Sequence, residues 1–213
     1  MNAEPASEEA VTHEGGDRKR LGPLVEIPFL LALAVVLTLV VKAFVAQAFY
    51  IPSESMEPQL RQGDRVVVSR TSYRLHDLRR GDIVVFPSPA APPEDEGLVV
   101  GLFHDVLESV ALRDPGDREL IKRVIGLPGE VIEGRDGHVM IDGRRLVEPY
   151  LGASVVTSDF GPFEIPDGRI FVMGDNRTNS HDSRFSDIGT IAVDSVVGRA
   201  IARVWPPNRT AFL

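Results

Sequence analysis

The sequence predicts a mainly β protein that is preceded by one N-terminal transmembrane helix. After Tyr50 the apolar runs are short, rich in Val and Ile, and bounded by turn residues, which is typical of β-strands. Before Tyr50 there is one apolar run that approaches the roughly 20 residues needed to cross a bilayer. No long amphipathic helical pattern competes with these signals.

Residues 1–23 are predicted to form a disordered cytoplasmic tail. Its first 17 residues are rich in Glu, Ala and Gly, so they cannot bury enough apolar surface to fold. The basic run 18–20 then stands just before the apolar segment. Short basic flanks favour the cytoplasmic side of a membrane, so everything after Tyr50 is predicted to lie outside.

Residues 24–48 are predicted to be the membrane anchor. The apolar segment carries a single charge, Lys42, whose amine can reach an interface. Two alternatives stay open, a buried helix of a soluble protein and a cleavable secretory signal that ends at the small residues Ala46 and Ala48. The run is longer than the roughly 7 to 15 apolar residues of such signals, which favours a permanent anchor.

Residues 49–213 are predicted to form one extracytoplasmic β-rich domain. Gly63-Asp64 and Gly81-Asp82 are typical of turns from which strands begin, and Asp142-Gly143 predicts a tight hairpin within 138–148. Gly198 is interpreted as a β-bulge. The candidate strands are 64–69, 82–86, 169–173 and 195–205.

Residues 87–118 differ from the rest of this domain, because they are rich in proline and acidic residues. We expect a surface excursion here rather than part of the core.

Composition excludes several classes of function. The formal net charge of -8 provides no basic surplus for binding phosphate backbones, so no nucleic-acid partner is expected. The absence of cysteine excludes disulfides, thiolate nucleophiles and Cys-ligated metals.

Three segments carry side chains suited to chemistry, and each also has an ordinary structural explanation. Ser53 and Ser55 lie between two prolines, which is also typical of a plain turn. Lys122 lies within an apolar strand, where burial would lower its pKa, although a lone lysine more often extends to solvent or pairs with an acid. The loop 174–184 is dense in Asp, Asn, Ser and Arg, as in a solvated loop or a cation-binding turn. Its spacing does not match a calcium loop, so no metal and no cofactor is predicted.

Taken together, the three segments resemble the type I signal peptidases, a family of serine proteases with a Ser/Lys dyad. The sequence PSESMEP from Pro52, KRVIGLPGE from Lys122 and GDNRTNSHDSR from Gly174 follow the order of the boxes of that family. The resemblance implies antiparallel β-sheets and a membrane-bound endopeptidase. Such an enzyme removes signal peptides from exported preproteins after Ala-any-Ala patterns, with those peptides and membrane lipid as its partners.

The resemblance also implies a role for individual residues. Ser55 would be the nucleophile and Lys122 its general base. Ser53 and the Ser55 backbone N–H would form the oxyanion hole, and Ser180 would orient the lysine amine. Two ion pairs would give structural support, Asp182 with Arg184 and Asp175 with Arg123. Three apolar residues would line the substrate pocket, namely Phe49, Ile51 and Ile121.

Two other functions stay open on the sequence. A Ser-His-Asp hydrolase is conceivable because His181 precedes Asp182, but neighbouring loop residues usually point apart. A membrane-tethered β domain that binds exported chains without cutting them is the second alternative.

Overall fold

The computed structural model describes residues 27–34, 37, 47–70, 73, 77–89 and 119–213. The chain divides into two compact units, residues 1–37 and 38–213. In the first unit, residues 27–34 are helical. No helix in the described part of the chain has the length and apolar character needed to cross a bilayer. The predicted tail, most of the predicted anchor and the excursion from residue 90 to 118 lie outside the described residues.

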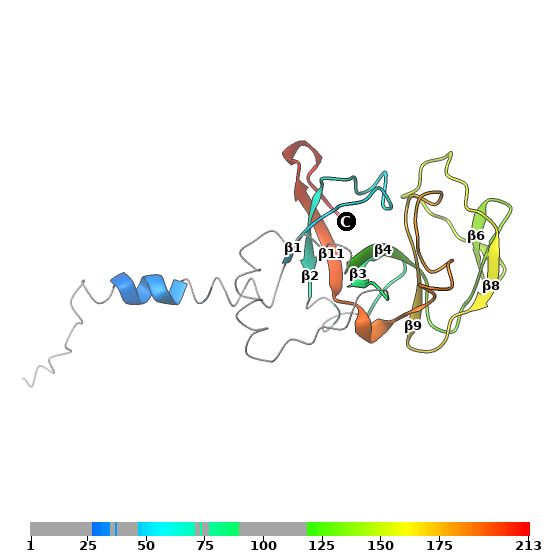
Figure 1. Ribbon diagram of the computed structural model, residues 1–213, viewed down its shortest axis with the longest axis horizontal. Coiled ribbons are helices and arrows are strands. Elements are labelled where there is room, and N and C mark those ends of the chain that lie inside the picture. The colour runs from blue at the N-terminus through cyan, green and yellow to red at the C-terminus, as the bar shows by residue number, and fades with distance from the viewer. Residues whose placement is uncertain (1–26, 35–36, 38–46, 71–72, 74–76, 90–118) are drawn as a thin grey trace, which may run out of the picture. The chain divides into compact units, whose positions relative to one another are not determined.

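The second unit is built from antiparallel β-strands, as predicted (Figure 1). Short 3-10 turns lie at Val193–Ser195 and Pro207–Arg209. The strands are β1 Gln47–Tyr50, β2 Arg65–Ser69, β3 Ile83–Pro87, β4 Glu119–Gly126, β5 Val131–Arg135, β6 His138–Ile141, β7 Arg144–Arg145, β8 Phe160–Glu164, β9 Arg169–Met173, β10 Ile191–Ala192, β11 Gly198–Trp205 and β12 Ala211–Phe212.

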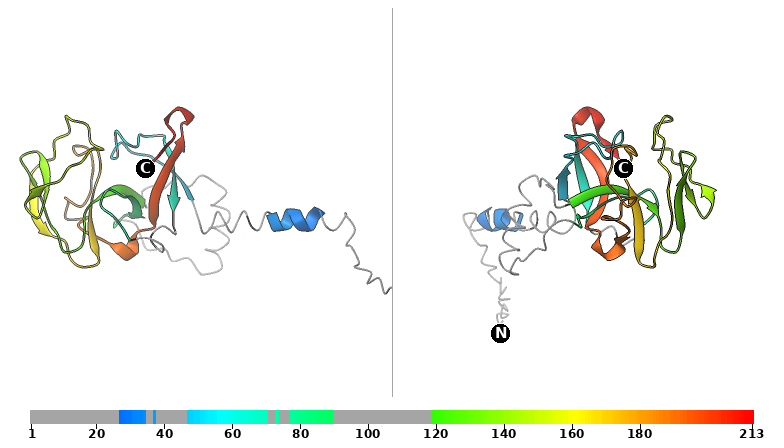
Figure 2. Two further views of the ribbon diagram at one scale, coloured as in Figure 1. Left: turned by 180° about the vertical axis from the view of Figure 1, so that it is seen from behind. Right: turned by 45° about the vertical axis from the view of Figure 1, so that its right-hand side comes forward.

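The described strands form two sheets. The larger has the order β1-β2-β11-β3-β4-β9-β10, with β12 paired to β11, and the smaller has the order β7-β6-β5-β8. Figure 2 shows from two further sides that β1, β2 and β11 lie at one end of this unit and β6 and β8 at the other, with β4 and β9 between them. Strand β4 pairs with β3 and β9, so its side chains lie in the middle of the larger sheet.

The β domain begins two residues earlier than the sequence predicts. Gln47 and Ala48, expected at the end of the anchor, lie in β1 and pair with Val68 and Val67 of β2. Their side chains are half-buried in the sheet. The apolar run therefore contributes its last residues to the β domain.

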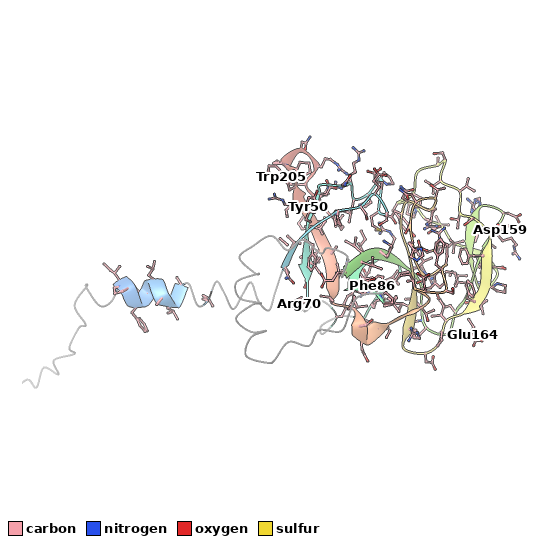
Figure 3. The ribbon with its side chains drawn as sticks, in the orientation of Figure 1. Tyr50, Arg70, Phe86, Asp159, Glu164 and Trp205 are labelled. Carbon is pink, nitrogen blue, oxygen red and sulfur yellow. The ribbon has the colours of Figure 1, made fainter. Side chains whose placement is uncertain are left out.

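Three apolar clusters hold the domain together. One gathers side chains from β1, β2 and β3 around Phe49 and Met56, and another packs around Phe86 and Val172. The third joins the two sheets, because Phe171 of the larger sheet packs with Ile132 of the smaller one. Figure 3 shows Phe86 inside the domain, whereas Asp159 and Glu164 lie at its outer edge near β8.

The predicted turns are present in the structure. Gly63 and Gly81 have φ angles of 91° and 93°, a left-handed conformation that glycine adopts without steric cost. The carboxylates of Asp64 and Asp82 each accept a backbone N–H three residues earlier, both at 2.9 Å. The hairpin between β6 and β7 turns at Asp142 and Gly143, where φ is 49° and 71°.

The predicted bulge at Gly198 is wrong. The register of β11 against β2 shifts between Ala200 and Ala202 and again between Arg203 and Trp205. Gly198 is needed for a different reason, since a Cβ there would lie 2.6 Å from the Ser69 carbonyl oxygen. The glycine allows the two strands to approach closely.

Candidate active site

The predicted nucleophile lies in the turn that links β1 to β2. Met56 and Leu60 are fully buried in the first apolar cluster and fix this turn to the core. Ser55 is buried but not sealed, with 8% of its surface exposed. Its hydroxyl lies 3.2 Å from the Ser53 hydroxyl. The sequence therefore places two serine hydroxyls side by side on a turn that core packing holds in place.

Lys122 reaches this turn from the middle of the larger sheet. On β4 it stands opposite Val84 of β3, and only 3% of its surface is exposed. Its Nζ lies 2.9 Å from Ser55 Oγ and 3.0 Å from the Ile121 carbonyl oxygen. The structure thus brings together two residues that are 67 positions apart in the chain.

Burial changes the acidity of this lysine. Loss of hydration disfavours the ammonium form and lowers the pKa of Lys122 from 10.5 to about 8. Asp182 and Asp175 oppose this shift, because their negative charges favour the ammonium. The desolvation effect is the larger of the two, so a substantial fraction of the amine is neutral in mildly alkaline solution.

A neutral amine fits the two contacts of Lys122 Nζ. It has one lone pair, which can accept the Ser55 hydroxyl hydrogen, and N–H groups, one of which can donate to the Ile121 carbonyl oxygen. This arrangement can move a proton from the serine oxygen to the lysine nitrogen without any rearrangement of the side chains.

The loop after β9 holds the backbone of the nucleophile. The Asn176 backbone N–H donates to the Ser55 carbonyl oxygen at 3.0 Å, and the Asn176 side chain donates to the Glu54 carbonyl oxygen at 3.2 Å. Gly174 packs directly beneath this turn, since a Cβ there would lie 2.4 Å from the Ser55 carbonyl oxygen. Only glycine allows the loop and the turn to come so close.

Two buried ion pairs shape the same loop. Arg123, next to Lys122, binds both oxygens of Asp175 at 2.8 and 2.7 Å. Arg184 binds both oxygens of Asp182 at 2.8 and 3.0 Å, and Asp182 also accepts the Gly174 backbone N–H at 2.9 Å. Bidentate pairs of this kind fix orientation as well as distance. Both ion pairs were expected from the family resemblance.

Ser180 differs from its predicted contact. Its hydroxyl is buried and forms no hydrogen bond within the described residues, and Lys122 Nζ instead contacts Ser55 and the Ile121 carbonyl. The hydroxyl lies against Gly174, where a Cβ would be 2.2 Å away. In this structure the second contact of the amine is the Ile121 backbone carbonyl rather than Ser180.

The three predicted pocket residues lie together in one apolar cluster. Phe49 and Ile51 are each only 1% exposed and belong to the first apolar cluster, so neither presents open surface. Ile121 is partly exposed and packs against that cluster. Of the three, Ile121 is the most exposed.

His181 does not join the serine. Its ring nitrogen lies 2.6 Å from an oxygen of Asp187, and both side chains are exposed. The adjacent Asp182 is fully buried and pairs with Arg184, so neighbouring residues of the loop do point apart. The described structure therefore contains no Ser-His-Asp arrangement around Ser55, whose hydroxyl contacts only Lys122 and Ser53.

One group of polar residues beside the site was not predicted from the sequence, namely buried Arg177 with partly buried Glu148 and Tyr150. Arg177 binds Glu148, which is 29 residues away in the chain. Spacing gives no signal for such a contact. Its only trace in the sequence is an arginine inside a loop already dense in acidic and amide side chains. In the described parts of the chain, no group of three or more His, Asp or Glu side chains is placed to hold a metal ion.

A serine hydroxyl that contacts a buried, partly neutral lysine on an antiparallel β scaffold defines a class, the hydrolases with a serine nucleophile and a lysine base. Comparison with known proteins narrows this class. The family model "Signal peptidase, peptidase S26" matches residues 24–205. The chain belongs to this family and is therefore a serine endopeptidase.

Three signal peptidases match nearly the whole length of this chain. Signal peptidase I of Leptolyngbya laminosa is 40% identical, with 90% of this chain and 84% of that protein covered. The probable signal peptidase I-2 of Synechocystis is 36% identical, covering 96% and 85%. Signal peptidase I of Mycobacterium tuberculosis is 36% identical, covering 98% and 81%. A crystal structure of a signal peptidase I from Enterococcus faecalis is 30% identical, covers 58% of this chain and 97% of that one, and gives a TM-score of 0.41.

Proposed function

We propose that this protein removes N-terminal signal peptides from exported preproteins, with Ser55 as nucleophile and Lys122 as general base. The observation that carries the assignment of these two residues is the 2.9 Å contact between Ser55 Oγ and an amine whose pKa is about 8. Family membership supports the reaction, and the geometry supports the choice of residues.

The chemistry would proceed in two stages. Neutral Lys122 accepts the hydroxyl proton while Ser55 Oγ attacks the peptide carbonyl carbon. The Ser55 backbone N–H and the Ser53 hydroxyl donate to the oxygen that becomes negative. The ammonium then protonates the departing amine. In the second stage Lys122 takes a proton from water as the water oxygen attacks the ester on Ser55, and the ammonium then returns that proton to Ser55 Oγ as the carboxylic acid leaves.

The packing around Phe49 and Ile51 supports a preference for small residues before the cut. Both side chains pack into the core and leave no deep cavity, so a substrate side chain above them would contact only a shallow apolar surface. Partly exposed Ile121 would form the wall of that surface. A bulky side chain would clash there, whereas alanine fits. This accounts for cleavage after Ala-any-Ala patterns.

The family acts at membranes, and we propose a single-pass anchor within residues 24–48, with the N-terminus in the cytoplasm and the β domain outside. The domain itself exposes apolar side chains suited to a lipid interface, Trp205 at 48% and Phe212 at 92%. Arg65 lies over the Trp205 ring, which adds a cation to this surface. Figure 3 shows Tyr50 and Trp205 at the same end of the domain.

The assignment can be tested with the detergent-solubilised full chain and a preprotein that carries an Ala-any-Ala site. We expect the wild type to release the mature protein with a new N-terminus directly after that site. Ser55→Ala and Lys122→Ala should leave the preprotein intact. Equal cleavage by all three would eliminate the dyad. A folded wild type that binds the preprotein without cutting it would support the non-catalytic alternative.

A further inference from the structure

A group of buried and partly buried polar side chains connects the smaller sheet to the loop that holds Ser55. We call it the Glu148 brace, and its members are Glu148, Tyr150, Thr157 and Arg177. The first three lie in the segment 146–157 between β7 and β8, and Arg177 comes from the loop after β9. None of them touches Ser55 or Lys122 through a hydrogen bond in the described structure.

Arg177 is the centre of the brace. The exposed fraction of its side chain is 0%, and that of the Glu148 side chain is 8%. Both guanidinium NH groups donate to the Glu148 carboxylate, and Nη1 also donates to Thr157 Oγ1 at 2.9 Å. The remaining donor, Nε, reaches the Gly174 carbonyl oxygen at 3.1 Å. One side chain therefore links the segment 146–157 to the residue that packs beneath the nucleophile.

Tyr150 extends the brace toward the lysine side of the dyad. Its hydroxyl donates to Glu148 Oε1 at 2.7 Å, and the Arg123 guanidinium lies 4.0 Å from the centre of its ring. Arg123 follows Lys122 directly on β4 and binds Asp175. Glu148 is therefore connected to both halves of the dyad, through Arg177 to the Ser55 turn and through Tyr150 to the neighbour of Lys122.

The segment that carries the brace is itself fixed to the smaller sheet. The Leu146 backbone N–H donates to the Val139 carbonyl oxygen at 2.8 Å, and the Thr157 backbone N–H donates to the Gly137 carbonyl oxygen at 3.0 Å. Removing the carboxylate partner of a buried arginine is strongly destabilising, and the other acid whose charge favours the Arg177 guanidinium, Asp175, is already bound to Arg123. Loss of the Glu148 charge therefore favours movement of Arg177 toward water. Such a movement would pull on Gly174, and Gly174 and Asn176 hold the Ser55 turn.

We propose that Glu148 and Arg177 are positioning residues, through which the smaller sheet holds the loop 174–179 against the nucleophile turn. The functional half of this inference rests on the proposed peptidase activity. The structural half does not, because it concerns the closure of the loop itself. The smaller sheet then helps to set the distance between Ser55 and Lys122, although it contributes no group to the chemistry.

The test uses the full chain in detergent with Glu148→Gln, which keeps the size of the side chain and removes its charge. Glu133→Gln is the matched control, because the Arg135–Glu133 pair lies on the same sheet with side chains 53% and 21% exposed. Backbone hydrogen exchange of the segment 174–179 should quicken about tenfold in Glu148→Gln and stay unchanged in the control. Exchange in β2 should not change in either variant.

Turnover supplies the second measurement. With a preprotein substrate, kcat of Glu148→Gln should fall about tenfold or more while KM stays within about twofold, because the dyad is misplaced rather than the substrate surface. Glu148→Asp should recover part of the loss. Rates are divided by the folded fraction from thermal unfolding, so that a loss of folded protein is not mistaken for a loss of kcat.

The proposal would be overturned if Glu148→Gln matches Glu133→Gln both in the backbone hydrogen exchange of the segment 174–179 and in kcat. Quickened exchange with unchanged kcat would overturn its functional half. If the wild type itself does not cleave, the proposed activity fails, and the exchange measurement still decides on the brace. If Glu148→Gln does not fold, Tyr150→Phe decides in its place. It removes only the hydroxyl bound to Glu148, so faster exchange in 174–179 supports the brace and unchanged exchange overturns it.

Discussion

The loop after β9, residues 174–190, has a buried side and an exposed side, which we call its dry side and its wet side. Each side contains an ion pair between an acidic and a basic residue. On the dry side Asp182 is fully buried and binds Arg184 and the Gly174 backbone N–H. On the wet side His181, its immediate neighbour, pairs with Asp187 while both side chains are more than half exposed. Exposed pairs contribute little and are screened by salt, whereas a buried pair fixes its surroundings. Burial, rather than residue type, therefore separates the ion pair that fixes the loop beside Ser55 from the pair that lies on its surface.

The largest expected effect lies at Lys122, which is 3% exposed. Lys122→Met keeps the length and burial of the side chain and removes its amine. We expect preprotein cleavage to fall by roughly 10²–10⁴-fold, the usual contribution of a general base. Thermal unfolding should not weaken, since no buried amine then needs desolvation. Cleavage at the wild-type rate would show that burial of Lys122 serves packing alone.

Asp175→Asn tests the dry side of the loop through stability. It leaves Arg123 buried without a charged partner, which costs about 3–5 kcal/mol for pairs of this kind. The free energy of unfolding, measured by urea denaturation, should fall accordingly. A loss comparable to that of an exposed pair such as Arg135–Glu133 would remove the distinction between the two sides of the loop.

The dependence of cleavage on pH sharpens the comparison, because the dry lysine must lose its proton before it can act. Since the pKa of Lys122 lies at about 8, kcat/KM should rise as the pH increases and level off above that value. Between pH 6 and pH 8 the neutral fraction grows about 50-fold, and the rate should follow. The measurement is a pH–rate profile at constant ionic strength. A profile that peaks in acid would contradict the assignment of the base.

Gly174→Ala tests how closely the loop must approach the nucleophile turn. The added Cβ would lie 2.2 Å from Ser180 Oγ and 2.4 Å from the Ser55 carbonyl oxygen, so one of the two segments must shift. We expect a loss of about 1–3 kcal/mol in unfolding free energy together with reduced kcat. Gly152→Ala is the control, because the nearest atom there is 3.8 Å away. Equal behaviour of the two variants would mean that the close approach is not required.

The smallest effect is expected on the wet side. His181→Ala removes an exposed ring whose partner, Asp187, is also exposed. Cleavage should stay within about twofold of the wild type, because surface substitutions away from buried features have little effect. The same preprotein assay measures it. A loss as large as that of Lys122→Met would revive the Ser-His-Asp interpretation.

Features that depend on local sequence were predicted well. The run 169–173 coincides with β9, and the Asp142-Gly143 turn forms the expected hairpin, because alternation and turn chemistry act over a few residues. The three boxes also placed Ser55 and Lys122 together, although their contact spans 67 positions. That prediction came from resemblance, since nothing in the spacing alone requires the two to meet.

Features that depend on packing were not predictable in this way. Gly198 looked like a bulge but serves a close approach between strands, and the deep burial of Phe49, which is 1% exposed, comes from contacts with residues distant in the sequence. The contact between Arg177 and Glu148 depends on how the two sheets pack, which no local pattern encodes. The hydrogen bond expected from Ser180 depends on how its side chain packs against Gly174.

The nucleophile follows β1 with very little intervening chain. Tyr50 ends that strand and Ser55 comes five positions later, so the connection can extend no more than about 18 Å. Ser55 is thus joined by only a few residues to the first strand of the β domain, and any sliding of β1 against β2 would carry its hydroxyl away from the lysine amine.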